Sequence, residues 1–459
     1  MVRSGTTSRA VFVALFVVYV AVGIWTTRKV STTGDEPIYF MAADALLHGE
    51  GLDLTHRWEA LPGAGYDPGD PISREEFERS TTPSRVRGGN YPLHDLATSL
   101  LIVLPFAAGG RGLVVVFVAA AMAAAVTLSH RAARTLGAPP IIAMGAALAV
   151  GLSAPALTYS GQVFADALAP LAFAIAVCAL LRALPPVLLG PAATMLILLH
   201  LRFWPLALAL IAAELVRTRP SPRQVGALLT PLAVAVAGLA LTDLVVYGVP
   251  LPHAGFLLFF TDRASASVAS YTHVTGEGIV GLVIDRSFGL LSAAPIAALL
   301  FAGAGRAMRD GPGRMLLALP IPYLLLVSVL DWTGGYNPQA RYLTVLVPLF
   351  VILMARALAW RPALLLAIPL GIWTLGQSSI YAVAPWLRYD FYGTAPSVDR
   401  AWSRVTAATP SAVFPLFGTD GTTLALAFAW CAVLALLFAV AYVAPHRRAG
   451  TVGTVMPLS

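Results

Sequence analysis

The sequence predicts an all-α protein that crosses a membrane about twelve times. The first reason is composition, because 58% of the residues are hydrophobic and only 12% are charged, well below the roughly 25% charged of a soluble domain. Mean hydropathy is accordingly high, at +0.77. The second reason is length: apolar runs of about 17–25 residues, enough to cross a bilayer as a helix, recur along the whole chain. The chain 1–459 therefore reads as a single integral membrane domain.

Each expected span follows from one of these runs. The spans are residues 10–27, 112–130, 139–158, 166–184, 186–200, 203–217, 225–247, 287–305, 314–331, 341–358, 362–381 and 424–444. The first ends in Trp25-Thr26-Thr27-Arg28-Lys29, which lacks a small-residue cleavage site, so it reads as a span rather than a signal peptide. Three long segments connect spans on one side of the membrane, at 28–111, 248–286 and 382–423.

The basic residues set the orientation. Short segments on the side of the N-terminus carry half of the 30 basic residues of the chain. These are Arg3, Arg9, Arg131, Arg134, Arg182, Arg217, Arg219, Arg223, Arg306, Arg309, Arg314, Arg356, Arg361, Arg447 and Arg448. Only Glu214 and Asp310 are acidic there. Because basic loops face the cytoplasm, both termini are predicted inside and the three long segments outside. The net charge of +7 then needs no nucleic-acid partner.

An acidic pair follows the first span, in Thr33-Gly34-Asp35-Glu36-Pro37. Charges beside lipid are costly and mark functional sites. Pro37 suits a first helical turn, and the apolar residues of 37–47 recur at helical spacing, which predicts a helix lying in the interface plane. Residues 93–108 predict a second such helix. Asp35 is our candidate general base, with a plain helix N-cap as the alternative. Glu36 orients Asp35 or the acceptor, or simply occupies the positive end of the helix dipole.

Two further polar motifs begin or precede spans on the outer side. Asp166, in Phe164-Ala165-Asp166, has no acid near it and is predicted to be a second catalytic or substrate-binding acid, or else a hydrogen-bond node. In His200-Leu201-Arg202, Arg202 is a candidate partner for a phosphate or an acid, and snorkelling is its alternative. His200 reads slightly better as a satisfied structural histidine.

Two more candidates lie nearer the C-terminus. Arg341 starts a span after a loop rich in Gly, Trp and Tyr, and it is a candidate phosphate ligand with Tyr342 beside it. Interfacial anchoring is the alternative for Arg341. Arg286 is a similar, weaker candidate that could instead pair with Asp285. Trp332 and Tyr336 fit an aromatic belt better than a sugar-stacking platform.

In their order, these motifs resemble the C-type (GT-C) membrane glycosyltransferases, and most of all bacterial relatives of the protein O-mannosyltransferase and aminoarabinose transferase group. The Asp-Glu pair in the first external loop carries the resemblance. Phe164-Ala165-Asp166 resembles the second acidic motif of that group, with Ala replacing a proline and Asp a glutamate. The other similar segments are His200-Leu201-Arg202, Tyr247–Pro252, Asp285–Leu290 and Trp332–Tyr342. Together the matches cover residues 10 to about 350.

The resemblance implies a GT-C-like fold and an enzyme that takes sugar from a polyprenyl-phosphate donor on the outer side of the membrane. Asp35 would accept the proton of the acceptor hydroxyl as the anomeric carbon inverts. The acceptor would be a glycan, a lipid or a protein of the cell envelope. One lysine, Lys29, against 29 arginines suggests a GC-rich bacterial genome, hence a bacterial plasma membrane.

Several other chemistries lack support in the sequence. No paired-His or other metal-ligand spacing occurs, so no metal ligand is assigned, although a divalent metal at the carboxylates stays open. Cys178 and Cys431 both lie in apolar runs and build neither a disulfide framework nor a metal site. The main rival function is a transporter or flippase for lipid-linked sugars, which would place ionisable residues in mid-span rather than at span ends. A non-catalytic scaffold of a cell-envelope complex is a third reading.

Overall fold

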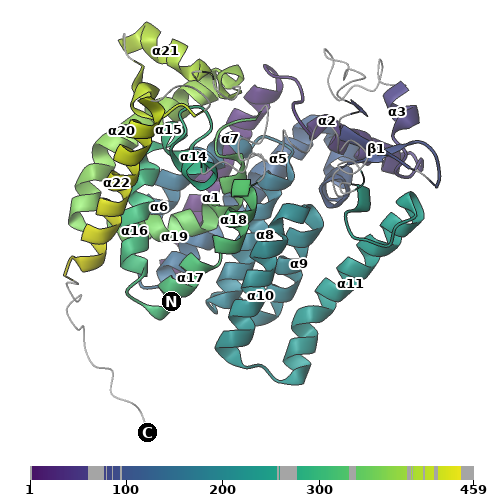
Figure 1. The fold of residues 1–459 in the computed structure, drawn as a ribbon, viewed down its shortest axis with the longest axis horizontal. Coiled ribbons are helices and arrows are strands. Elements are labelled where there is room, and N and C mark those ends of the chain that lie inside the picture. Colours follow the sequence, from purple (N-terminus) through teal and green to yellow (C-terminus); the bar gives the residue numbers. More distant parts are fainter. Residues whose placement is uncertain are drawn as a thin grey trace.

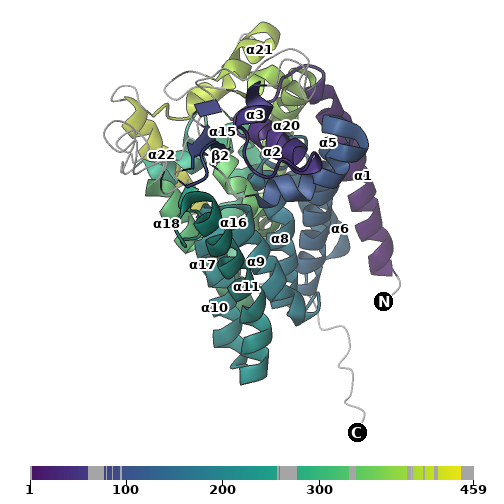
Figure 2. The same cartoon turned by 90° about the vertical axis from the view of Figure 1, so that its right-hand side faces the viewer.

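The computed structural model describes residues 3–59, 77–78, 80–84, 86–93, 96–255, 258, 277–329, 337–389, 394, 396–406, 409–417 and 422–445. Helices dominate these residues, and they stand roughly side by side in Figures 1 and 2. The first half of the chain forms α1 (Arg3–Thr27), α2 (Glu36–Leu47), α3 (Thr55–Glu59), β1 (Thr81–Pro83), β2 (Asn90–Pro92), α5 (Ala97–Thr135), α6 (Pro140–Gly151), α7 (Ala156–Tyr159), α8 (Ala165–Leu180), η2 (Pro186–Leu188), α9 (Leu189–Leu199), η3 (Leu201–Phe203), α10 (Trp204–Thr218) and α11 (Pro222–Tyr247).

The second half continues the bundle. Its elements are α14 (Gly278–Ile284), α15 (Leu290–Ala293), η4 (Pro295–Ala298), α16 (Leu299–Ala307), α17 (Gly311–Ala318), α18 (Ile321–Val329), η5 (Arg341–Leu346), α19 (Val347–Leu358), α20 (Arg361–Val383), η6 (Pro385–Arg388), α21 (Ser397–Thr406), η7 (Pro410–Val413) and α22 (Thr422–Val443). The two short strands pair antiparallel, with Thr82 opposite Tyr91.

Every one of the twelve expected spans contains helix, but the count of twelve is not confirmed. Within the described part of the chain, seven stretches are long and apolar enough to cross a membrane, and they lie within α1, α5, α11, α17–α18, η5–α19, α20 and α22. Four more apolar helices are shorter, at 10–17 residues. Three expected spans are interrupted where the run contains a proline: at Pro155 between α6 and α7, at Pro295 where η4 begins, and at Pro320 between α17 and α18. Proline has no backbone N–H to continue the ladder, which is why these runs break.

The long helix α5 joins two elements that the sequence placed separately. Its first half corresponds to the expected interfacial helix 93–108, and its second half to the span 112–130. They meet at a kink, where Gly110 has φ 57°, a conformation that glycine adopts without strain.

Helix α2 is more deeply enclosed than a helix lying on a membrane surface. Ile38, Met41, Ala42 and Ala45, which recur at helical spacing, are buried, but so are Tyr39, Phe40 and Ala43 on the other sides. The first half of α5 covers it, and the ring centroids of Phe40 and Phe106 lie 5.5 Å apart. Enclosure on several sides gives the start of α2, next to Asp35, a fixed frame.

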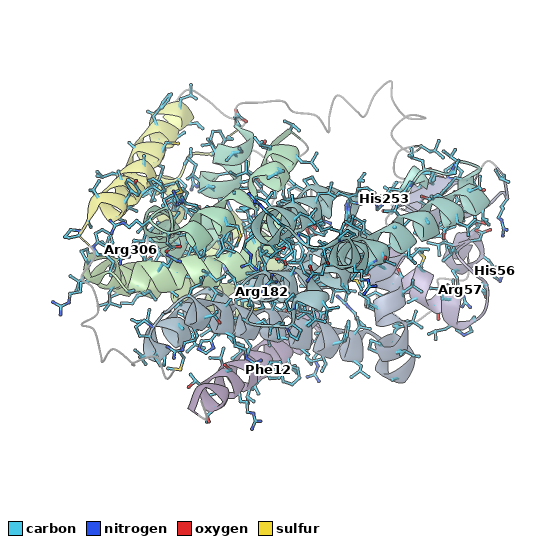
Figure 3. All side chains as sticks on the ribbon, turned by 90° about the horizontal axis from the view of Figure 1, so that it is seen from below. Phe12, His56, Arg57, Arg182, His253 and Arg306 are labelled. Atoms are coloured by element: carbon cyan, nitrogen blue, oxygen red, sulfur yellow. The ribbon has the colours of Figure 1, made fainter. Side chains whose placement is uncertain are left out.

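The ends of the bundle differ in the way the charge pattern predicts. We call the end that holds the start of α1 and the α10–α11 and α16–α17 connections the arginine end; it lies at the bottom of Figure 1. Figure 3 views that end and labels Arg182 and Arg306 on it. The two acids expected there both bind arginine: Glu214 lies 2.6 Å from Arg182, and Asp310 lies 2.5 Å from Arg356.

The opposite end, which we call the loop end, carries α2, α3, the two strands and α21. The described helices and strands of the long segments 28–111 and 382–423 are therefore gathered at one end of the molecule. The candidate site residues also belong to turns and helix starts at this end.

Candidate active site

Asp35 lies in the turn between α1 and α2, and its carboxylate is not used to cap α2. It occupies the N-cap position but makes no side-chain capping hydrogen bond. Instead, its Oδ2 accepts a hydrogen bond from Arg341 Nη2 at 2.5 Å. The turn depends on Gly34, which has φ 56° and sits where a Cβ would lie 3.2 Å from the ring of Phe164. The Asp35 side chain therefore does not cap α2, which was the alternative role for this residue.

Arg341 joins the two predicted acids. Its Nη2 binds Asp35, and its Nε donates to Oδ2 of Asp166 at 3.0 Å. The same Oδ2 atom lies 2.5 Å from Nη2 of Arg202. Four residues from four parts of the chain thus form one alternating row, Asp35–Arg341–Asp166–Arg202, which we call the charge row. Its formal charges cancel.

Burial within the charge row is graded. The Asp166 side chain is 0% exposed, Arg202 is 7%, Arg341 is 9% and Asp35 is 17%. Charged groups are rarely this buried unless they are paired, since desolvation costs several kcal/mol per ion. Asp35 is the most exposed member of the row, whereas the Asp166 side chain has no exposed surface. The Oδ1 atom of Asp166 is buried and has no hydrogen-bond donor among the described residues.

Aromatic rings flank the two arginines. The Arg341 guanidinium lies 4.8 Å from the ring centroid of Phe164, and that of Arg202 lies 5.0 Å from Tyr342 and 5.2 Å from Phe203. Such cation–π contacts keep a guanidinium in place while its donor edges stay directed at acids. Tyr342 therefore belongs to the site as a wall for Arg202.

The backbone before Arg341 is strained. Ala340 has φ 59°, in the left-handed region that non-glycine residues seldom adopt. Its N–H donates to the carbonyl of Phe288 at 2.9 Å. On the same loop, the hydroxyl of Tyr159 donates to the carbonyl of Pro338 at 2.8 Å. Strain of this kind persists where the surroundings fix the backbone, and it is enriched at functional sites.

His200 supports Arg202 from within its own turn. Its Nδ1 accepts the backbone N–H of Arg202 at 3.2 Å, and its Nε2 lies 3.3 Å from Arg202 Nη1. These contacts fit the structural role that the sequence slightly favoured for His200, which stays a prediction. The imidazole fixes the guanidinium and is itself buried.

Glu36 is held away from the solvent and ties two motifs together. Its Oε1 accepts the backbone N–H of Val163 at 2.7 Å, and its Oε2 accepts that of Thr33 at 3.1 Å. Arg111 Nη2 lies 3.7 Å from the same Oε2. With 2% exposure, the Glu36 carboxylate fixes the Asp35 turn against the segment that leads to Asp166.

Two tyrosines near the acidic pair, Tyr389 beside Glu36 and Tyr39 beside Asp35, were not identified from the sequence. The hydroxyl of Tyr389 accepts a hydrogen bond from Gln162 Nε2 at 2.5 Å and one from Thr33 Oγ1 at 3.4 Å. Burial, and then the negative charge of Glu36, raise the pKa of Tyr389 to about 12. Burial, followed by the charge of Asp35, also raises the pKa of Tyr39. Both phenols stay neutral near pH 7, so neither supplies a base.

Arg286 belongs to a different cluster. Its Nη2 binds Asp399 Oδ2 at 2.8 Å, and its Nε donates to Ser411 Oγ at 2.8 Å. Asp285 does not pair with it; the Asp285 carboxylate accepts backbone N–H groups of Ser287 and Phe288 instead. The structure therefore joins Arg286 to α21 and η7 rather than to the charge row.

Trp332 and Tyr336, which the sequence places in an aromatic belt, lie outside the described part of the chain. Within the described residues, no group of three or more His, Cys, Asp or Glu side chains is arranged to hold a metal ion.

The comparisons with known proteins do not assign the chain to a family. No protein-family model matches the chain, and a sequence comparison finds no match among curated proteins. Two solved structures align with it. The Archaeoglobus fulgidus oligosaccharyltransferase in the apo form aligns at TM-score 0.44 and 14% identity, over 82% of this chain and 56% of that one. The archaeal oligosaccharyltransferase AglB from A. fulgidus, in complex with an inhibitory peptide and a dolichol-phosphate, aligns at TM-score 0.42 and 14% identity, over 96% and 56%. The chain spans little more than half the length of these proteins, so its function is argued from the site itself.

Proposed function

We propose that this protein is an inverting glycosyltransferase that moves a sugar from a polyprenyl-phosphate donor to a hydroxyl of a cell-envelope glycan, lipid or protein. The observation that carries the proposal is the charge row, in which one accessible carboxylate is backed by two guanidinium groups at the loop end. The apolar helices fit a multi-pass protein of a bacterial plasma membrane, with both termini cytoplasmic and the loop end outside.

Asp35 takes the proton. The acceptor hydroxyl oxygen forms a bond to the anomeric carbon of the sugar, while the bond from that carbon to the phosphate oxygen breaks and its electron pair leaves with the lipid phosphate. The hydroxyl proton goes to the Asp35 carboxylate. A positioned carboxylate base typically contributes about 10²–10⁴-fold to the rate.

The arginines stabilise the departing phosphate. Guanidinium groups bind phosphate oxygens through paired N–H donors, and they act most strongly where water is excluded. Arg202 and Arg341 are already aligned by Asp166 and by the rings of Phe164 and Tyr342. Little reorganisation is therefore needed when charge develops on the leaving group.

Donor binding also activates the base. In this structure the Asp35 carboxylate shares Arg341, and an ion pair weakens a carboxylate as a base. A donor phosphate beside Arg341 competes for the same guanidinium. As the phosphate shares the Arg341 guanidinium, Asp35 becomes more basic, so proton abstraction is favoured only when a donor is present.

Sugar transfer by purified protein tests the proposal. Polyprenyl-phosphate sugars are offered with a panel of envelope glycans, glycolipids and peptides, and glycosidic product is measured. Asp35→Asn should lower the rate at least about 10²-fold. Asp44→Asn is the matched control, because Asp44 lies on α2, which Asp35 precedes, but binds Arg57 instead. A folded Asp35→Asn protein that retains near wild-type rates would show that the base is misassigned.

The rival reading, a flippase or transporter, predicts a different result in the same preparation. Movement of the sugar-lipid across proteoliposomes, with no glycosidic product from any acceptor, would replace the enzyme proposal with that one. The placement of the charge row at helix starts, rather than in mid-helix, supports the enzyme.

A further inference from the structure

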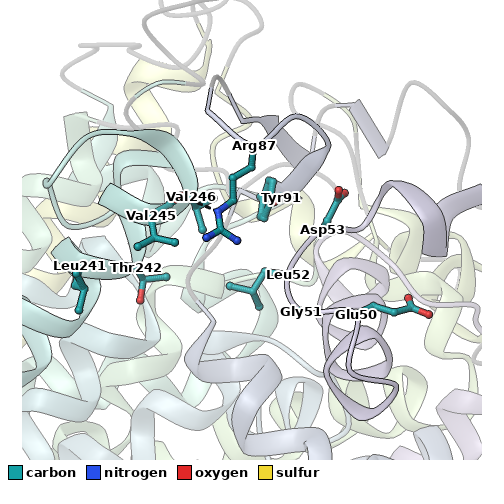
Figure 4. Close-up of a pocket in the computed structure, with 10 residues that line it drawn as sticks. All are labelled: Glu50, Gly51, Leu52, Asp53, Arg87, Tyr91, Leu241, Thr242, Val245 and Val246. Carbon is teal, nitrogen blue, oxygen red and sulfur yellow. Dashed lines mark hydrogen bonds between the residues drawn. The ribbon is translucent and has the colours of Figure 1, made fainter.

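A pocket of about 360 Å³ lies at the loop end, away from the charge row, between the first long segment and α11 (Figure 4). The segment contributes Leu52, Asp53, Arg87 and Tyr91 to its lining. Helix α11 contributes Leu241, Thr242, Val245 and Val246 from its last two turns. Neither the expected catalytic chemistry nor any sequence motif accounts for this pocket.

The wall of the pocket that α11 contributes is mostly apolar. Leu241 is 62% exposed and Val245 is 42% exposed, and α11 as a whole is the least buried of the seven candidate spans. Large apolar side chains this exposed on a span-length helix face lipid. The pocket is therefore continuous with the surface that would carry acyl chains.

Its upper wall holds a positive charge that no acid neutralises. Nε of Arg87 donates to the carbonyl of Val245 at 3.1 Å, which fixes the side chain over the end of α11. Among the described residues, no carboxylate lies within ion-pair distance of Arg87. The other guanidinium nitrogens are thus available to a ligand.

The facing wall holds a negative charge, Asp53, for which the described residues supply no cationic partner. Oδ1 of Asp53 accepts the backbone N–H groups of Thr55 and Asn90 at 3.0 and 3.2 Å. No described residue donates to its Oδ2. The nearby Glu50 is already occupied by Arg57, through hydrogen bonds of 2.6 and 2.7 Å. Arg87 and Asp53 therefore line one pocket with opposite charges that do not reach each other.

We propose that this pocket binds the headgroup of a zwitterionic phospholipid that carries a primary ammonium group, of the phosphatidylethanolamine class. The phosphate lies on Arg87, the ammonium group donates to Asp53, and the acyl chains run along Leu241 and Val245 of α11. A headgroup of this class carries the two charges in the order that the pocket provides. A purely anionic headgroup would satisfy Arg87 and leave Asp53 facing a negative charge.

Native mass spectrometry of the detergent-purified full chain tests the site with three lipids: phosphatidylethanolamine, phosphatidylcholine and phosphatidylglycerol. Wild-type protein should retain phosphatidylethanolamine best. Arg87→Gln and Asp53→Asn should each weaken that binding about tenfold, the loss of one charge-assisted contact. Both replacements keep a structural hydrogen bond, since Gln still donates to Val245 and Asn still accepts at Oδ1. Arg223→Gln, at the other end of α11, is the matched control and should change nothing.

Three results would overturn the proposal. One is binding of phosphatidylglycerol as tight as that of phosphatidylethanolamine and improved by Asp53→Asn, which would make this a plain anion site. Another is displacement of phosphatidylethanolamine by equimolar polyprenyl phosphate, which would assign the pocket to the donor. The third is equal binding to wild type, Arg87→Gln and Asp53→Asn. The readout is lipid binding rather than sugar transfer, so the proposed activity can fail without affecting it.

Discussion

At the residue scale, the two acids of the charge row differ in exposure, and this difference suits them to different roles. Asp35 is the accessible one, whereas Asp166 is fully enclosed and holds both Arg202 and Arg341 through a single oxygen. An enclosed acid with two cationic partners cannot be removed without leaving buried positive charge. Asp166 is thus better placed to position the arginines than to touch the acceptor.

This division predicts that the two asparagine variants fail differently. Asp35→Asn should lose sugar transfer while its melting temperature stays near wild type. Asp166→Asn should lose both, with about 3–5 kcal/mol of stability gone because the buried arginines lose their counter-charge. Thermal melting in detergent beside the transfer assay measures both properties. Equal melting temperatures for the two variants would contradict the assignment.

Glu36 is predicted to act through position rather than contact. Glu36→Gln keeps an oxygen for the N–H of Val163 but removes the charge facing Arg111. The Asp35 turn then shifts relative to Asp166, and kcat should fall about tenfold or more with acceptor KM unchanged. Steady-state kinetics over a range of acceptor concentrations separates the two parameters. A rise in acceptor KM at constant kcat would instead make Glu36 an acceptor ligand.

The sequence predicts a site residue only when the pattern that marks it lies in the neighbouring residues. Asp35, Asp166, Arg202 and Arg341 stand out because each is a charge at the end of an apolar run. The partners of Glu36 do not, because a backbone N–H such as that of Val163 looks the same in any sequence. Tyr389 lies 356 residues from its partner Thr33, and no periodicity links them.

At the element scale, the turn between α14 and α15 connects to α21 and η7. Arg286 and Asp399 make the connection, with Ser411 bound to both. Asp285 adds a second link, because its Oδ2 accepts the N–H of Phe417 at 3.1 Å. The sequence suggested Arg286 as a phosphate ligand, and its contacts offer a direct way to separate that role from a structural one.

We predict that Arg286→Gln and Asp399→Asn have the same effect. Each removes one side of the same largely buried ion pair, so α21 should open more often. Hydrogen exchange of the amides in 397–406 should then be faster in both variants, with donor KM close to wild type. A rise in donor KM for Arg286→Gln alone, without faster exchange, would restore the phosphate-ligand role.

Asp285 makes this turn sensitive to pH. Burial raises its pKa to about 6 from an ordinary 3.8, despite the N–H groups that it accepts. The folded state therefore binds this proton more tightly than the unfolded state. Its contribution is fully present below about pH 4 and is lost as the pH rises through about 6, by roughly 3 kcal/mol at most.

The check compares Asp285→Asn with wild type over this range. Asparagine cannot ionise, so the stability of wild type relative to Asp285→Asn should fall from pH 4 to pH 6.5 and then level off. Melting temperatures of both proteins in one detergent give the difference. A difference that is constant with pH would mean that Asp285 ionises normally in the folded protein.

At the scale of the whole molecule, the sequence predicted the two ends of the bundle better than the shape of its helices. Charge bias depends only on which turns carry arginine, and the start of α1 and the α10–α11 and α16–α17 connections do lie at one end of the bundle in Figure 1. Hydropathy, in contrast, cannot tell a continuous span from one broken at Pro155 or Pro295. It also gave no sign that α2 would be covered by α5, because that packing depends on residues far apart in sequence.

The orientation itself is a prediction that two single cysteines test. Ser403 is exposed on α21 at the loop end, and Thr218 is exposed where α10 ends at the arginine end. Cys178 is buried, and Cys431 lies in the apolar helix α22, so Cys431→Ala leaves a quiet background. A membrane-impermeant maleimide should label Ser403→Cys in intact cells, but Thr218→Cys only after the membrane is permeabilised. The reverse pattern would put the charge row on the cytoplasmic side, where a donor presented outside could not reach Asp35.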